Sequence, residues 1–326
     1  MTFNFNSARR VIVLATACLA SASAFSQDYP NRPIKVVVPY PAGGGSDVIT
    51  RLASEKMQEL LKQPVIIDNK PGAGSVIGTD AVVRAPADGY TLLFNIPALV
   101  QVPILQKKVP FDPVRDLIAV TTLGSAPVWF AVSTTESKAT SFPAFVEEAR
   151  KASKGTAYGS WGIGTTNHLY GELLTKAMGV KTIHVAYKGA APGALALANG
   201  EVTFMLGDYT SLRPFADTGK IRILASTGSR RHRLTPDVPT LGELGYPGFE
   251  SVGWGGYFVP KGTPMDVVEK LQKAISITAR DERVSRRLLE LGYEPGGKPQ
   301  EEFAAEVKAD AQRWKRLIEA AGIQSE

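Results

Sequence analysis

The sequence is poor in the residues that build redox and metal sites. Its only cysteine, Cys18, lies in the first 26 residues, which we expect to be removed, so disulfides and thiolate metal sites are excluded from the mature chain. Only three histidines occur, without an H-E-x-x-H spacing, and no G-x-S-x-G motif is present. The sequence therefore predicts neither a metal ion nor a cofactor.

Acidic residues are missing from residues 1–26, and no later apolar run approaches the length of a membrane span. Arg9 and Arg10 precede an apolar run over 11–20, and small residues follow it. This order is typical of a secretory signal, and we expect cleavage after Ala24 or after Ser26. The mature protein is predicted to be exported and soluble.

Large charge of one sign is also absent. Without residues 1–26 the chain has 35 basic and 31 acidic residues, which suits a small anion but predicts no nucleic-acid partner. With 44% apolar and 21% charged residues over 326 positions, the composition is that of a globular protein. A chain of this length usually divides, so we expect two lobes.

Strand-like and helical patterns alternate along the chain. Strands are predicted at 34–38, 65–68 and 90–94, with helices at 47–61 and from about 75, and this order predicts an α/β fold. An extended stretch over 117–132, broken at Gly124 and Pro127, is interpreted as the crossing into a second lobe. The chain returns after a polar loop at 228–239, and a helix is predicted after Pro264. We therefore assign 27–124 plus 229–326 to lobe 1, and 125–228 to lobe 2.

Each predicted lobe has a glycine-rich turn between a strand and a helix, at 38–47 and 157–168. Glycines let a ligand approach the backbone, and the free N–H groups of a helix's first turn favour an anion. Two facing turns of this kind predict a cleft for a carboxylate. A third loop, 69–78, follows a strand, but its G-x-G-x-x-x-G spacing does not fit a dinucleotide-binding turn.

A secreted hydrolase that uses Ser160 and His168 is the alternative function, although no acidic partner can be named. His168 is otherwise a ligand donor or a residue of the helix-capping region, and the sequence leaves both open. His184, between apolar neighbours in a strand, is predicted to be structural.

Five segments in order resemble one known family: 41–47 (PAGGGSD), 69–74 (NKPGAG), 87–92 (ADGYTL), 184–189 (HVAYKG) and 236–240 (PDVPT). They resemble the Bug-type periplasmic solute receptors of tripartite tricarboxylate transporters, over nearly the whole mature chain. The resemblance implies a two-lobed periplasmic binding protein of type II, a Venus flytrap with two sheets and a hinge. It also implies a monomer that passes a carboxylate to the membrane subunits of a transporter or to a sensor.

In such receptors the first glycine loop holds the ligand carboxylate, and the second lobe adds further contacts. Carried over to this sequence, the predicted ligand-binding residues are Ala42, Gly43, Gly44, Gly45, Ser46, Asp47, Ser160, Trp161, Gly164, Thr165, Thr166, Asn167, His168, Tyr187 and Asp208. The chain departs from the family pattern at Ala186, which stands in place of proline, and at Trp161, where a small polar residue is common. Trp161 predicts either stacking on an aromatic dicarboxylate or a lid over an aliphatic di- or tricarboxylate. Asp47 is predicted to cap the helix or to contact a ligand's ammonium group.

Overall fold

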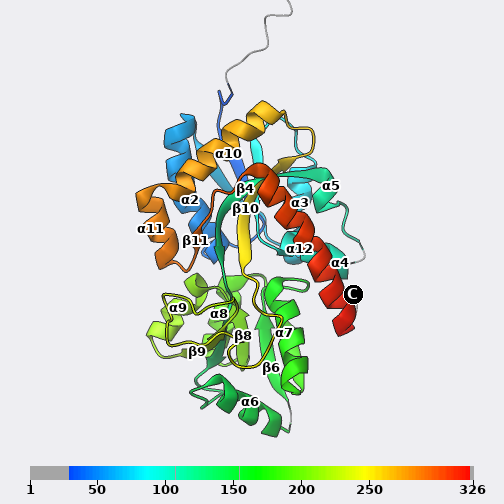
Figure 1. The fold of residues 1–326 in the computed structure, drawn as a ribbon, viewed down its shortest axis with the longest axis vertical. Coiled ribbons are helices and arrows are strands. Elements are labelled where there is room, and N and C mark those ends of the chain that lie inside the picture. The colour runs from blue at the N-terminus through cyan, green and yellow to red at the C-terminus, as the bar shows by residue number, and fades with distance from the viewer. Residues whose placement is uncertain (1–28, 107, 154, 324–326) are drawn as a thin grey trace, which may run out of the picture.

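The computed structural model describes residues 29–106, 108–153 and 155–323. The predicted signal segment and its cleavage site lie outside these residues. Two β-sheets stand one above the other, each with its own helices, as Figure 1 shows. The predicted α/β class is confirmed.

The first sheet has the strand order β11-β4-β10-β3-β1-β2. Its strands are β1 (Ile34–Val38), β2 (Val65–Asn69), β3 (Thr91–Asn95), β4 (Leu117–Ala126), β10 (Gly253–Pro260) and β11 (Glu294–Pro295). β1 pairs in parallel with β2 and β3, whereas β10 runs antiparallel between β3 and β4. The carboxyl ends of β1 and β3 therefore meet at one edge, which faces the second sheet.

The second sheet has the strand order β7-β6-β8-β5-β9. Its strands are β5 (Trp129–Ser133), β6 (Thr156–Ser160), β7 (Thr182–Ala186), β8 (Phe204–Gly207) and β9 (Ile221–Ser226). β6 lies parallel to β7 and β8, so the turn after β6 and the turn after β8 leave the sheet at the same edge.

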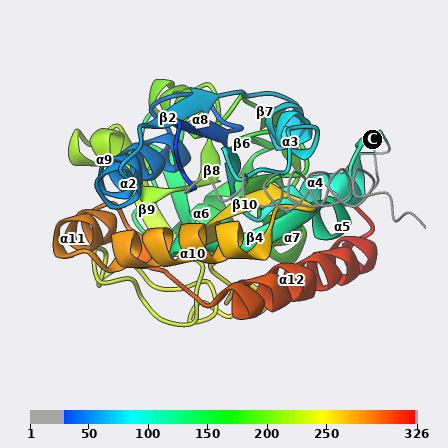
Figure 2. The ribbon, with the colours of Figure 1, turned by 90° about the horizontal axis from the view of Figure 1, so that it is seen from above.

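Helices cover both sheets. Around the first lie α2 (Gly45–Leu61), the 3₁₀ turn η1 (Ala73–Ser75), α3 (Val76–Val83), α4 (Ala98–Leu105), α5 (Pro113–Asp116), α10 (Met265–Arg280), α11 (Glu282–Glu290) and α12 (Gln300–Ala321). Around the second lie α6 (Phe142–Lys151), α7 (Thr166–Met178), α8 (Ala190–Asn199) and α9 (Tyr209–Asp217). From above, α10 and α12 lie along one side of the molecule, and the edge strands β2 and β7 along the other (Figure 2). No helix within the described residues is long and apolar enough to cross a membrane.

The helix predicted after Pro264 is confirmed as α10. Val268, Leu271 and Ile275 recur at helical spacing and are fully buried, so packing of one apolar face explains why this segment is a helix. The predicted helix over 47–61 begins two residues earlier, at Gly45.

The chain passes from the first sheet to the second between β4 and β5. The interruption lies at Pro127 and Val128, where a proline removes a ladder donor. Gly124 was expected to break the strand as well, and that expectation is wrong: it pairs with Gly255 and Pro295 inside β4.

The chain returns through residues 227–252, between β9 and β10. Much of this segment packs on the second sheet: Thr240 bridges to Ser226, and the Tyr246 ring meets the Phe142 ring of α6 at 5.3 Å. A single cluster of buried apolar side chains includes residues of both sheets, such as Phe258 and Phe204. The two halves are therefore in close contact.

Candidate ligand-binding cleft

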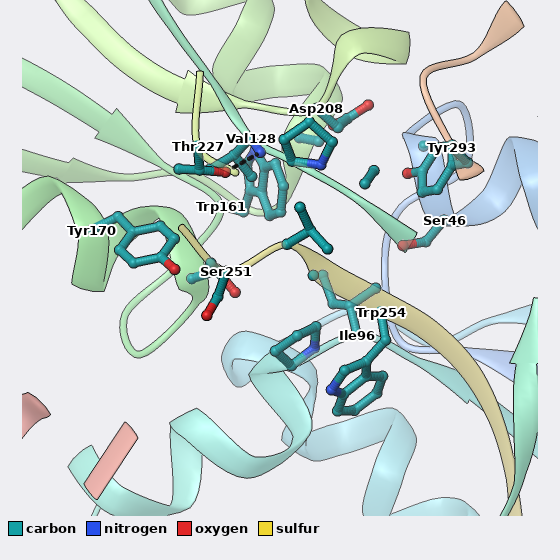
Figure 3. Close-up of a pocket in the computed structure, with 18 of the residues that line it drawn as sticks. Ser46, Ile96, Val128, Trp161, Tyr170, Asp208, Thr227, Ser251, Trp254 and Tyr293 are labelled. Atoms are coloured by element: carbon teal, nitrogen blue, oxygen red, sulfur yellow. Dashed lines mark hydrogen bonds between the residues drawn. The ribbon is translucent and has the colours of Figure 1, made fainter. Parts of the chain in front are cut away.

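A cavity of about 810 Å³, partly open to solvent, lies between the two halves beside the crossing segments. The first half contributes the turn after β1, the turn after β3 and the loop that holds Tyr293. The second half contributes Trp161 and Thr166 from the turn between β6 and α7, and Asp208 from the turn between β8 and α9. Figure 3 shows these side chains around one open space.

One end of the cavity is formed by the start of α2. Gly44 is the N-cap residue, and no side chain caps the helix. Within the described residues, the amides of Gly45 and Ser46 donate no hydrogen bond to the protein, and both residues line the cavity. Free amides at the positive end of a helix form a site for an anion.

The turn before α7 offers fewer amides than the sequence suggested. Its N–H groups are taken up by side chains of the same turn and helix over 3.1–3.4 Å: Trp161 by Asn167, Gly162 by Ser160 and Gly164 by His168. Thr166, at the start of α7, lines the cavity. Because the turn uses these three amides itself, its contribution to the cleft comes mainly from the first turn of α7 and the Trp161 side chain.

Asp208 brings a buried carboxyl to the α2 end of the cavity. It is 6% exposed, caps α9 by accepting the Ser211 N–H at 2.9 Å, and has a pKa that burial raises. A Cβ atom added to Gly45 would lie 2.7 Å from Asp208 Oδ1 and 2.6 Å from Tyr293 Oη. Burial and the neighbouring Asp208 charge also raise the Tyr293 pKa well above its ordinary value.

Trp161 separates this cavity from a second one of about 670 Å³. The second cavity is lined by the 71–75 and 186–189 segments, and Tyr187 belongs to it rather than to the first cavity. The indole Nε1 of Trp161 is buried without a hydrogen-bond partner among the described residues. This position is compatible with stacking on a ligand and with a lid.

Nine of the predicted site residues lie outside the lining of the first cavity: Ala42, Gly43, Asp47, Ser160, Gly164, Thr165, Asn167, His168 and Tyr187. The structure brings six others into the lining: Gly44, Gly45, Ser46, Trp161, Thr166 and Asp208.

Asp47 has a structural role at the α2 turn. Its carboxylate accepts the Gly43 N–H at 3.0 Å and the Asn69 amide at 2.9 Å, and pairs with Arg51 at 3.0 Å. Burial alone would raise its pKa, but these three partners outweigh burial and lower it. Asp47 therefore stays ionised and holds the glycine turn in shape, although it caps no α2 amide itself.

Ser160 is bonded to a different histidine from the one that the hydrolase alternative needs. Its hydroxyl lies 2.7 Å from His184 Nε2, whereas His168 Nδ1 accepts the Gly164 N–H at 3.1 Å. The two imidazoles stack at 4.2 Å, and burial lowers the pKa of each to about 4. Ser160 and His168 are buried, His184 is half-buried, and none of the three lines the cavity, so the group supports the turn.

Several lining residues were not predicted from the sequence. They are Tyr40, Ile96, Pro97, Thr227, Ser251, Trp254, Tyr293 and Arg313, among others. Tyr40 lies in the 38–47 turn, but the others belong to no local motif, and packing of distant segments places them at the cleft. Within the described residues no cluster of metal-ligating side chains occurs.

Residues 49–323 match the family described as the tripartite tricarboxylate transporter family receptor. The chain belongs to this family. A relative from Pseudomonas sp. strain P51, encoded in a tcbD-tcbE intergenic region, is 36% identical over 314 residues, 95% of this chain and 93% of that protein. BugT of Bordetella pertussis is 31% identical over 314 residues, 95% of each protein.

Solved structures agree with this membership. The periplasmic binding protein BugD superposes with a TM-score of 0.87 at 32% identity, over 91% of this receptor and all of BugD. An R. palustris protein solved with adipate superposes with a TM-score of 0.87 at 31% identity, over 91% of this chain and 99% of that protein. MatC from Rhodopseudomonas palustris, solved with malate, superposes with a TM-score of 0.84 at 28% identity, over 89% of this chain and all of MatC.

The Bug-type resemblance is thereby confirmed, together with the two-lobed fold of a periplasmic binding protein. The protein is a solute-binding receptor and not an enzyme, since its family and its structural relatives are receptors. The hydrolase alternative has no support, and the Ser160–His184 pairing removes the geometry that it assumed.

Proposed function

We propose that this receptor captures a small carboxylate in the cleft between its lobes and delivers it to the membrane subunits of a tripartite transporter. The observation that supports it most directly is the pair of unused amides, Gly45 and Ser46, at the positive end of α2 inside a largely apolar cavity. Each hydrogen bond to a charged group contributes about 1.5–3 kcal/mol, so these amides supply part of the ~8 kcal/mol that micromolar binding needs. The adipate and malate of the solved relatives are both carboxylates.

In this proposal Gly44, Gly45, Ser46, Trp161, Thr166 and Asp208 face the ligand, and the other predicted residues maintain the two turns. The lobes are residues 27–124 with 229–326, and 125–228. The protein is exported to the periplasm after cleavage near Ala24 or Ser26 and acts as a monomer. A sensor protein in place of the transporter is the alternative partner.

A thermal-shift panel of carboxylates tests the proposal. An acid at 100 times its dissociation constant is expected to stabilise the fold by about 2.7 kcal/mol, whereas amides and alcohols of the same size produce no shift. If no acid in a broad panel raises the melting temperature, the receptor does not bind carboxylates at this cleft. Catalytic consumption of candidate esters would revive the enzyme alternative.

The finer proposal is that the ligand is an aromatic dicarboxylate whose ring stacks on Trp161. In the alternative, Trp161 forms a lid over an aliphatic di- or tricarboxylate. Trp161→Ala is expected to weaken an aromatic carboxylate by about 1–2 kcal/mol and to spare an aliphatic one, because offset ring pairs add about 0.5–1.5 kcal/mol beyond buried area. Calorimetric titration with terephthalate and adipate measures both. Trp161→Phe, the matched control, keeps a ring and most of the affinity, and equal losses for the two acids would refute stacking.

A further inference from the structure

The cavity has a second polar end, far from α2. In Figure 3, Tyr170 and Ser251 lie on the side opposite to Ser46, Asp208 and Tyr293. Arg313, from α12, completes this end and is bonded to Ser251. A cationic side chain therefore lies at the opposite end of the cleft from the free amides.

The Arg313 guanidinium is held in a fixed orientation. Its Nη1 donates to Ser251 Oγ at 2.5 Å, and its Nε and Nη2 lie 3.2 and 3.0 Å from Asp310 Oδ1. Asp310 is held in turn by the Trp254 indole N–H at 2.8 Å, and the guanidinium lies 4.9 Å from the Trp314 ring centroid. Asp310 is thus a positioning residue for the arginine.

Arg313 still has donors to offer. Its side chain is 28% exposed, and a guanidinium carries five N–H groups, more than Ser251 and Asp310 use. Tyr170 lies beside it: burial raises the Tyr170 pKa, and Arg313 partly offsets that rise. A planar fork of donors next to a hydroxyl is suited to a carboxylate, because both of its oxygens can be bonded at once.

Apolar side chains separate the two polar ends. They are Ile96, Pro97, Val128, Trp161, Val252 and Trp254. A solute that is polar in its middle would lose hydration there without gaining partners, whereas an alkyl chain or a ring would not. The lining therefore discriminates against solutes with hydroxyl groups between their ends.

We infer that Arg313, with Ser251 and Tyr170, forms a subsite for the second carboxylate of a dicarboxylic acid whose middle is apolar, and so determines that the receptor prefers diacids to monoacids. This inference rests on the proposed function, in which α2 binds the first carboxylate.

The test compares each diacid with the monoacid that has a methyl group in place of the distal carboxylate: adipate with hexanoate, and terephthalate with 4-methylbenzoate. Calorimetry on the full mature receptor is expected to give at least one diacid that binds about tenfold more tightly than its monoacid. In Arg313→Gln the two acids of that pair bind equally, and the dissociation constant of the monoacid is unchanged. Arg313→Lys keeps the charge but loses the planar pair of donors, so its ratio of the monoacid to the diacid dissociation constant is expected to be intermediate.

Arg316→Gln is the matched control, since Arg316 is an exposed arginine of the same helix and its loss removes the same charge. It is expected to leave the ratio at about ten. Equal weakening of diacid and monoacid by Arg313→Gln would assign the arginine a purely structural role and overturn the inference, and so would a wild-type ratio near one. Those results leave the proposed function standing, because monoacid binding supports it separately. If none of the four acids binds, this inference is overturned, and the proposed function is overturned as well only if no acid of the broad panel binds. Ser251→Ala keeps the charge and removes one hydrogen bond, so a smaller fall in the ratio is expected even if Arg313→Gln does not fold.

Discussion

Gly45→Ala is expected to weaken the binding of every carboxylate by about 100-fold or more. The new methyl group would lie 2.6 Å from Tyr293 Oη and 2.7 Å from Asp208 Oδ1, closer than side-chain carbons approach oxygens. Asp208 belongs to the second half and is held by the Ser211 N–H, so relief of the contact displaces either this side chain or the start of α2. Loss of two charge-assisted amide bonds, at about 1.5–3 kcal/mol each, corresponds to this factor. Calorimetric titration measures it.

Gly44→Ala is the matched control for this change. An added Cβ there would lie 3.7 Å from the Pro41 carbonyl oxygen and 3.8 Å from Ala190 Cβ, which are ordinary contacts, and the φ of −79° suits any residue. Because Gly44 also lines the cleft, some loss of affinity is expected, but a clearly smaller one than in Gly45→Ala. Equal losses in both variants would show that the turn tolerates no side chain at all and that closeness to Asp208 is irrelevant.

Asp208→Asn is expected to tighten the binding of an anionic ligand by roughly 30-fold at neutral pH. The Asp208 carboxyl is buried and lies close to Gly45 at the start of α2, so its ionised form repels a ligand carboxylate there, and at an effective dielectric constant near 20 two like charges at short range interact by a few kcal/mol. Asparagine caps a helix as well as aspartate does, so α9 keeps its start. Titration of wild type and variant with the same diacid measures the gain. A loss of affinity would instead identify a ligand ammonium group held by Asp208.

The same substitution is expected to change how stability depends on pH. Burial raises the Asp208 pKa in the folded receptor, so the folded state retains this proton to a higher pH than the unfolded chain, in which the group titrates near 3.8. The contribution of this proton to the free energy of unfolding is fully present below pH 3.8 and is lost as the pH rises through the pKa of Asp208 in the folded receptor. Wild type is therefore expected to lose more stability than Asp208→Asn between about pH 4 and neutrality. Melting temperatures over that range measure the difference, and parallel profiles would contradict it.

The first glycine turn was predictable from the sequence because its properties are local. Glycines 43–45 between a strand and an apolar-striped helix determine a close-approach turn at a helix start, and the structure has one. The second turn shows the limit of that argument. Its glycines suggested equally free amides, but the side chains of Ser160, Asn167 and His168 bond them, and a pattern of residue types does not show which donors are already used.

Asp47 and Asp208 also show that the partners of a side chain cannot be predicted from the types of its sequence neighbours. Both stand at a helix start, and the family resemblance placed both in the predicted ligand site. Arg51 and Asn69 hold Asp47 in its ionised form outside the cavity lining, whereas Asp208 is buried at the cleft and forms no ion pair with any residue that the structure describes. The pKa values move in opposite directions because partners differ, and the partners come from elsewhere in the chain.

The sequence by itself determined the α/β class, the two glycine turns and the family, since strand and helix periodicity and short motifs depend on neighbours in the chain. Only the tertiary structure decided which groups face the ligand. Ser46, Trp161, Tyr293 and Arg313 lie far apart in the sequence, and the packing of two sheets brings them to one cavity. No local rule specifies that arrangement, because it depends on the simultaneous burial of apolar faces from every segment.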